Sequence, residues 1–229
     1  MPPVLLLFDI DGTLLTSGGA GEKALRTGLL SRFGIQDDLQ GIEIAGRTDS
    51  GIARRILERH QIPPAPENIR RLLDGYLEAL PTLLPLHSGR VLHGVLPLLN
   101  ALRQRSDCIL GLLTGNLEQG ARLKLAHYGL HDRFQLGAYA DDHHDRNALV
   151  PFALRRAAAL AGTDIPPART WVIGDTPYDV ECARAGGARA AAVATGVFSS
   201  SALAAAQPDL LLPDLGQTDR ILELLLPPP

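Results

Sequence analysis

Two aspartates, Asp9 and Asp11, directly follow a run of five apolar residues (4–8) and precede Gly12 and Thr13. A short unbroken apolar run is typical of a strand that is buried on both faces in the middle of a parallel sheet. Ligands of such sheets bind beyond the carboxyl ends of the strands. Because side chains two apart on a strand point the same way, we expect the two carboxylates side by side at the floor of a ligand crevice.

Two neighbouring carboxylates repel each other unless a cation or a hydrogen-bond network intervenes. The pair Asp9 and Asp11 therefore indicates either a metal site or a division of labour between a nucleophile and an acid/base. Oxygen ligands at a strand end suit a hard cation such as Mg2+. The alternative is a strand followed by a simple Asp-Gly turn. That alternative explains Asp11 and Gly12 but not an aspartate at the end of a buried strand.

A second buried strand, residues 109–114, ends in Thr114 and is followed by Gly115 and Asn116. A hydroxyl at this position, together with the free N–H groups of the turn, can hold a phosphate oxygen. The alternative is that Thr114 only caps the helix that follows.

A third strand end carries Asp175, with Asp179 four residues further on. The alternative is a turn favoured by Thr176 and Pro177. Because Asp9 also ends a buried strand, the two strand-terminal aspartates together favour a site over two unrelated turns.

The elements that must position these residues fall into two groups. Residues 20–85 show only helical patterns, with a helix stop at Gly34, a helix start at Thr48 or Asp49, and a helix from Pro66 that Pro81 and Pro85 end. In the rest of the chain, predicted helices and strands alternate. The helices cover 94–105, 118–128, 148–161 and 177–185, and one more ends at 226. The strands cover 109–114, 134–139, 171–175, 190–193 and 210–212. We therefore predict an α/β fold: residues 1–16 and 87–229 form a doubly wound, Rossmann-like parallel sheet core, and residues 17–86 form a small α-helical cap domain inserted after the first strand.

The composition of the chain limits which classes of partner and which cellular compartment we expect. The 229 residues carry a net charge of −3, which gives no electrostatic footprint for nucleic acid. The two cysteines, Cys108 and Cys182, have no metal or redox spacing, which is typical of a reduced, cytoplasmic compartment. No signal peptide or transmembrane stretch is evident. We expect a cytoplasmic protein with neither a nucleic-acid nor a membrane partner.

Residues 9–14, with the sequence DIDGTL, resemble the first motif of the haloacid dehalogenase-like (HAD) hydrolases. Thr114 is similar to the second motif of that family, and residues 174–179 to its fourth. The nearest resemblance is to phosphoglycolate-phosphatase-like members with a helical cap. It implies an Mg2+-dependent phosphatase that acts on a small phosphorylated metabolite, as a monomer or homodimer.

The resemblance also implies roles for single residues. Asp9 is the nucleophile that forms an aspartyl-phosphate, and Asp11 is the acid/base. Metal binding is expected of Asp9, the backbone carbonyl of Asp11, and Asp175, with Asp179 supporting the metal site. Contacts to the substrate or its phosphoryl group are expected from Gly12, Thr13, Thr114, Gly115 and Asn116.

The third motif departs from the family pattern. The family normally supplies a lysine between the third strand and the strand of the fourth motif, but no lysine follows Lys124. Arg146 is the nearest replacement and offers phosphate a bidentate fork instead of a compact point charge. Lys124, on the helix after the second motif, is the other candidate. In the cap, Arg47 stands just before a helix, where it is expected to meet an anionic group of the substrate.

Three alternatives to this function stay open. A dehalogenase of the same fold would not need Asp11. A phosphoglucomutase-like phosphotransferase would share every motif but would transfer phosphate to a sugar instead of water. A binding or regulatory module that has lost turnover is favoured only by the missing lysine. The adjacent histidines His143 and His144 are interpreted as part of a solvated loop near the site, not as a metal centre.

Overall fold

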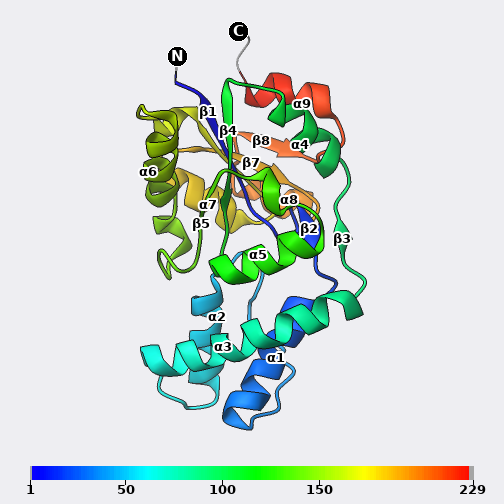
Figure 1. Cartoon of the computed structure of the whole chain (residues 1–229), viewed down its shortest axis with the longest axis vertical. Coiled ribbons are helices and arrows are strands. Elements are labelled where there is room, and N and C mark those ends of the chain that lie inside the picture. Colours follow the sequence, from blue (N-terminus) through cyan, green and yellow to red (C-terminus); the bar gives the residue numbers. More distant parts are fainter. Residues whose placement is uncertain (1, 227–229) are drawn as a thin grey trace.

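The computed structural model describes residues 2–226, so Met1 and residues 227–229 of the predicted core lie outside the described residues. Six parallel strands form the main sheet in the order β5-β4-β1-β6-β7-β8. Their bounds are β1 Val4–Phe8, β4 Cys108–Leu113, β5 Leu136–Ala138, β6 Thr170–Gly174, β7 Arg189–Val193 and β8 Leu210–Leu212. Helices cover both faces of this sheet (Figure 1), which confirms the predicted doubly wound α/β fold.

Strand β1 lies in the middle of the sheet because every one of its five side chains is apolar and buried. Side chains at its odd and even positions point to opposite faces of the sheet. Leu6 packs with α4 (Val95–Arg103), α5 (Glu118–His127) and α9 (Thr218–Leu225). Leu5 and Leu7 pack with α6 (Val150–Ala161), α7 (Pro177–Ala185) and α8 (Ser200–Ala205). Full burial of one such side chain contributes about 1.5–3 kcal/mol, so two-sided coverage fixes β1 at the centre.

Three further helices, α1 (Ala20–Phe33), α2 (Asp49–Arg59) and α3 (Pro66–Leu83), lie at the end of the molecule opposite helices α4 and α9 (Figure 1). They enclose a hydrophobic cluster of their own. Helices α1 and α3 approach closely at two glycines, since a Cβ on Gly28 would lie 2.7 Å from the backbone nitrogen of Tyr76. We call residues 17–86 the cap segment; its status as a separate domain with these bounds stays a prediction.

Several local expectations need correction. Helix α3 does not end at Pro81 but continues through it to Leu83. A proline this near the end of a helix removes only one hydrogen bond, the one to the carbonyl of Leu77. Strand β5 is shorter than the predicted 134–139, and helix α8 was not predicted.

A second sheet of two short strands, β2 (Leu15–Thr16) and β3 (Arg90–Val91), was also not predicted. It joins the two linkers that connect the cap segment to the core. The linkers pass so close that a Cβ on Gly18 would lie 2.8 Å from the backbone nitrogen of Gly89. Within residues 2–226, the structure contains no helix with the length and apolar character needed to cross a membrane.

Candidate active site

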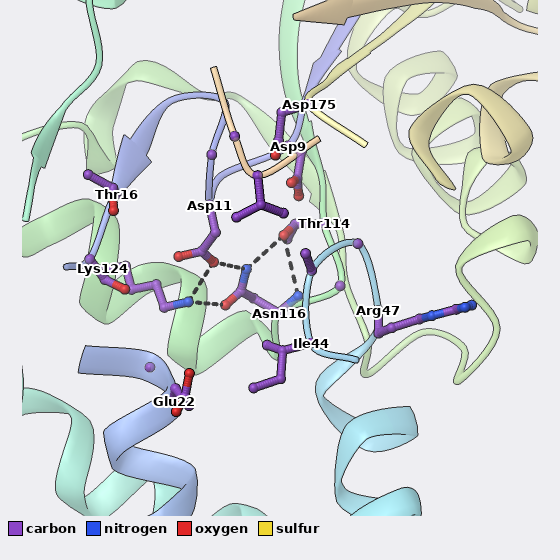
Figure 2. A pocket seen from close by; sticks show the side chains of 18 of the residues that line it. Asp9, Asp11, Thr16, Glu22, Ile44, Arg47, Thr114, Asn116, Lys124 and Asp175 are labelled. Atoms are coloured by element: carbon purple, nitrogen blue, oxygen red, sulfur yellow. Dashed lines mark hydrogen bonds and ion pairs between the residues drawn. The ribbon is translucent and has the colours of Figure 1, made fainter. Parts of the chain in front are cut away.

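The three central strands end in the residues that the sequence singled out. Asp9, Thr114 and Asp175 each follow immediately after β1, β4 and β6, respectively. Because these strands are parallel neighbours, their carboxyl ends meet at one edge of the sheet. Figure 2 shows the three side chains together at one side of a pocket. All three are buried.

The loop after β1 separates the two aspartates more than predicted. Strand β1 stops at Phe8, and the carbonyl of Ile10 then accepts hydrogen bonds from the N–H groups of residues 13–15. Asp11 therefore stands in a turn and not on the strand, which corrects the expectation of two carboxylates side by side along a strand. They remain close enough that the charge of Asp11 contributes to raising the pKa of Asp9.

Asp9 belongs to a buried cluster of acids. Asp9, Asp175 and Asp179 offer carboxylate oxygens that lie within 4.8 Å of one another. Arg146 supplies the cation: its Nη2 lies 3.2 Å from Oδ1 of Asp9 and also donates to Asp179. Asp179 additionally accepts from the backbone N–H and the hydroxyl of Thr176, at 3.0 and 2.7 Å, in a capping box that starts α7.

The surroundings of this cluster favour protonated carboxyls when no further cation is bound. Burial raises the pKa of Asp9 to about 6, although Arg146 acts in the opposite direction. Burial and the charges of Asp179 and Asp9 raise the pKa of Asp175 to about 8. A Cβ at Gly12 would lie 2.3 Å from Oδ2 of Asp175, so a glycine is needed there, and its φ of 84° suits glycine as well. Buried carboxylate oxygens in excess over cations are a donor set that fits a hard divalent cation such as Mg2+.

Asp11 is held by a different cation. Nζ of Lys124 lies 2.5 Å from Oδ2 of Asp11 and 2.7 Å from Oδ1 of Asn116. The Asn116 amide nitrogen in turn donates to Asp11 at 2.9 Å and to the Thr114 hydroxyl at 2.8 Å. Figure 2 shows this chain of contacts along one wall of the pocket. The Thr114 hydroxyl also lies near Asp9 and lowers the pKa of that carboxyl.

Lys124 also faces the cap segment. Burial alone would lower its pKa, but the negative charges of Asp11 and Asp49 and the nearby Tyr76 hydroxyl raise it above the ordinary value. Asp49 is the first residue of α2; its carboxylate accepts from the N–H of Leu117 at 2.8 Å. Burial raises the pKa of Asp49 to about 6, while Lys124 lowers it. A single buried ammonium thus lies where the cap segment meets the core.

Both candidates for the missing third-motif lysine therefore reach the site. Arg146 contacts Asp9, and Lys124 contacts Asp11. The two do not compete for one position, since each cation holds a different carboxylate.

Arg47 does not point toward the acids. Figure 2 shows its side chain directed away from Asp9 and Asp11. Its guanidinium binds Glu43 at 2.6 Å and the Tyr178 hydroxyl at 2.8 Å, and stacks 3.8 Å from the centre of the Tyr178 ring. Arg47 thus joins the cap segment to α7 while it also lines the cavity, and its contact with substrate stays a prediction.

The remaining predicted site residues differ in where they lie relative to the pocket. Thr13 is fully buried and donates to Oδ1 of Asp175 at 3.0 Å, so its side chain supports that carboxylate instead of facing the pocket. Gly115 lies against the cap segment, where a Cβ would meet the carbonyl oxygen of Arg47 at 2.1 Å. Gly12, Gly115 and Asn116 line the pocket, and their contacts with substrate stay predictions.

Sequence reasoning missed Thr195 and Gly196, which follow β7. The Thr195 hydroxyl donates to the carbonyl of Gly12 at 2.6 Å, and a Cβ at Gly196 would lie 1.7 Å from Oδ2 of Asp175. The sequence signal that could have identified them is a hydroxyl residue and a glycine shortly after the predicted strand 190–193.

These residues enclose a cavity of about 590 Å³ between the sheet edge and the cap segment. Such a volume falls in the range of small-molecule sites. Core residues around Asp9 form one side of it, and residues of α1, α2 and α3 form the other, including Leu25, Ile52 and Tyr76.

Comparisons with known proteins identify relatives of this chain. A family model described as HAD-hydrolase-like matches residues 147–218. The phosphoglycolate phosphatase of Synechococcus elongatus is 31% identical over 213 residues, which cover 90% of this chain and 91% of that protein. Among solved structures, a hydrolase from Pseudomonas syringae has a TM-score of 0.74 at 20% identity and covers 97% of this chain and 99% of its own. CbbY from Rhodobacter sphaeroides in complex with phosphate has a TM-score of 0.75 at 20% identity, covering 94% and 96%.

Proposed function

This chain belongs to the haloacid dehalogenase-like hydrolases and is a phosphatase, and from that premise we propose that it hydrolyses a small organic phosphate monoester through an aspartyl-phosphate on Asp9. The ester is a phosphoglycolate-like compound or a sugar phosphate. The name of the Synechococcus relative supports the first, and the xylulose bisphosphate bound to a CbbY variant supports the second.

The observation that carries the proposal is the separate pairing of the two aspartates. Asp9 is buried against Arg146, whereas the Asp11 side chain is 38% exposed and is held by Lys124 at the cavity wall. Environments this different suit different roles. The buried carboxylate suits a fixed nucleophile, and the carboxylate at the cavity wall suits proton transfer to a bound ester.

The proposed reaction has two steps. In the first, an Asp9 oxygen attacks phosphorus in line with the leaving oxygen, and the Asp11 carboxyl protonates that oxygen as the bond breaks. In the second, Asp11 takes a proton from water, which attacks the aspartyl-phosphate and restores Asp9. Arg146 neutralises charge beside the nucleophile, and the Thr114 hydroxyl and the backbone N–H of Gly115 orient the phosphoryl oxygens.

Mg2+ is part of the proposal. Asp9, Asp175 and the backbone carbonyl of Asp11 would hold the ion, while Asp179, engaged by Thr176 and Arg146, would support them. A bound ion supplies positive charge that reduces the repulsion between the phosphate dianion and an anionic nucleophile. The raised pKa values of Asp9 and Asp175 support this assignment, because a bound cation would favour the ionised form of both carboxyls.

The cap segment is proposed to act as a lid that excludes water during the first step. Its contacts with the core through Asp49, Glu43 and Arg47 support a closed arrangement. A cytoplasmic location is part of the proposal and is supported by Cys108 and Cys182, which are both free. The protein is proposed to act as a monomer or homodimer.

The test is phosphate release from a panel of small phosphate esters, with and without Mg2+, by the native protein, Asp9→Asn and Asp132→Asn. Asp132 is an exposed acid on a short 3-10 helix away from the cavity, so its substitution controls for loss of a charge. We expect release that requires Mg2+, is lost in Asp9→Asn and is retained in Asp132→Asn. Acid-quenched native protein should carry one phosphoryl group on the peptide that contains Asp9. Full activity of Asp9→Asn would refute the proposal, and phosphate transfer to an added sugar without release would identify a phosphotransferase.

A further inference from the structure

Residues 43–47, which we call the cavity loop, lie shortly before α2 and contribute to one wall of the cavity through residues 44–47. Tyr178, the second residue of α7, contacts both ends of this loop. It stands between Asp175 and Asp179 in the sequence, yet it has no part in the proposed chemical steps. Its contacts with the cavity loop therefore point to a role outside those steps.

Three side chains form a closed set of contacts where the cavity loop meets α7. The Tyr178 hydroxyl donates to the carboxylate of Glu43 and accepts from Nη2 of Arg47 at 2.8 Å. The Arg47 guanidinium also donates to Glu43 at 2.6 Å and lies 3.8 Å from the centre of the Tyr178 ring. The hydrogen bond from Tyr178 is the main cause that lowers the pKa of Glu43. Each of the three side chains thus contacts both others.

The middle of the cavity loop packs against the same tyrosine. Gly46 has a φ of 72°, and a Cβ there would lie 2.5 Å from Cδ2 of Tyr178 and 2.7 Å from the Thr176 hydroxyl oxygen. Glycine is needed for this close approach. The Gly46 carbonyl also lies 3.4 Å from Nη1 of Arg146, the cation that contacts Asp9. The position of the loop is therefore linked to the cation beside the proposed nucleophile.

Tyr178 belongs to the more rigid side of this junction. Helix α7 begins with a capping box, and the ring of Phe198 packs edge-on against the ring of Tyr178, with centroids 6.3 Å apart. The cavity loop, in contrast, lies outside the helices and strands of the cap segment. We therefore expect the core residue to determine where the loop lies.

We propose that Tyr178 is a positioning residue of the phosphatase. Its hydroxyl and ring hold the cavity loop against the core, which keeps the Gly46 carbonyl beside Arg146 and keeps water away from the reacting phosphoryl group. Tyr178 touches neither substrate nor metal in this role and acts only through the loop. The inference rests on the proposed function for the reaction that Tyr178 assists, whereas the attachment of the loop can be measured without turnover.

Tyr178→Phe removes the hydroxyl and keeps the ring. We expect kcat/KM for the best ester of the panel to fall about 10-fold, which corresponds to about 1.4 kcal/mol, the scale of one hydrogen bond to a charged group. The loss should be mainly in kcat, because the phosphoryl group still binds to the core but the closed arrangement forms less often. Tyr139→Phe is the matched control, because Tyr139 is also half-buried but lines a different cavity beside β5. It should keep the native kcat/KM.

Amide hydrogen exchange measures the attachment of the loop independently of turnover. The N–H of Asp49 donates to the carbonyl of Gly115 at 2.7 Å, and this hydrogen bond forms only while the cap segment contacts the core. Its exchange, followed by NMR, should be about 10-fold faster in Tyr178→Phe, because the same free energy favours the closed arrangement. Amides of the central strand β1 should exchange at the native rate, which shows that the core is intact.

A double variant identifies the partner of the hydroxyl. If Tyr178 acts through Glu43, the loss of kcat/KM in Glu43→Ala/Tyr178→Phe should be clearly smaller than the product of the two single losses, since partners in one contact are not independent. Glu58→Ala, on the exposed side of α2, controls for the loss of an acid from the cap segment and should have native kcat/KM. Single losses that multiply in the double variant would contradict a shared attachment.

The outcomes keep the two proposals apart. Native kcat/KM in Tyr178→Phe, or native exchange of the Asp49 amide, overturns the inference and leaves the phosphatase intact. If the native protein releases phosphate from no ester of the panel, the proposed function fails. Tyr178 then has no reaction to assist, and the inference fails with it even where the exchange of Asp49 is faster.

Discussion

Replacement of Lys124 by methionine removes the one buried ammonium that contacts both the core and the cap segment. Methionine keeps the length of the side chain and removes its charge and its three donors. The carboxylate of Asp11 loses a 2.5 Å partner, and the Asn116 carbonyl loses a donor at 2.7 Å. Asp49 loses its nearest cation while it stays buried.

The size of the effect follows from how exposed each partner is. Loss of one member of a fully buried ion pair costs about 3–5 kcal/mol. Here the Lys124 side chain is 6% exposed but that of Asp11 is 38% exposed, so water can replace part of the lost contact. We expect the free energy of unfolding to fall by about 2 kcal/mol, mostly from the unsatisfied Asn116 oxygen and the unpaired Asp49. For a chain of this size the melting temperature should fall by about 4–8 °C.

The effect on turnover should be larger than the effect on stability. Positioned general acid–base catalysis contributes about 100-fold to 10,000-fold, and Asp11 without Lys124 is free to leave its position. We expect kcat to fall about 100-fold with a smaller change in KM. Steady-state kinetics on one good ester and urea unfolding should be measured on the same preparations, at a temperature at which the variant is fully folded.

The sequence offers a matched control, since Lys23 is the only other lysine. It lies exposed on α1, so Lys23→Met should change neither kcat nor stability appreciably. A Lys124→Met protein with kcat within about 3-fold of native would refute the claim that Lys124 positions the acid/base. Loss of stability without loss of turnover would reduce Lys124 to a purely structural contact between cap segment and core.

Two further predictions concern the other charged groups of the site. Arg146→Lys should lower kcat about 10-fold, because an ammonium cannot reproduce the fork that contacts Asp9, Asp179 and the carbonyl of Gly46 together; native-like kcat in this variant would show that a point charge is enough. Asp49→Asn should change the pH dependence of stability. Because burial raises the folded-state pKa of Asp49 from 3.8 to about 6, the native protein binds this proton more tightly than the unfolded chain does, and the resulting stabilisation, complete below about pH 4, is lost as pH rises through 6. Urea unfolding from pH 4 to 7 should show the variant gaining on the native protein by about 2 kcal/mol, and parallel curves for the two proteins would contradict this reasoning.

Much of the core was predictable because its signals are local. The apolar runs of β1, β4 and β6 are long enough to identify buried strands, and the polar residues that end them follow from the sequence alone. The elements that escaped prediction are short. Helix α8 has fewer than two turns and buries only Leu203, and β2 and β3 have two residues each, which is too few for any periodic pattern.

The site was predictable only as far as the strand ends. Asp9, Thr114 and Asp175 meet because parallel neighbours end together. The reach of Arg146 to Asp9 and of Lys124 to Asp11 depends on how a 3-10 turn and a helix pack on the sheet, which periodicity does not specify. The contacts of Asp49 and Tyr76 depend on how the cap segment sits on the core. Arg47 was predicted from its place before a helix, but its partner Tyr178 comes from a segment far away in the sequence.

The central place of β1 has a consequence for how the protein folds. This strand precedes both of its neighbours along the chain, since β4 begins at Cys108 and β6 at Thr170. The cap helices, by contrast, find most of their partners among residues 20–84 and can form through contacts of low sequence separation. During synthesis β1 therefore has no partner strand until nearly half of the chain has been made, and its second edge stays unpaired until β6 is reached at Thr170, a condition that favours aggregation. The nucleophile is among the first residues to be made, and its site is among the last parts of the protein to be completed.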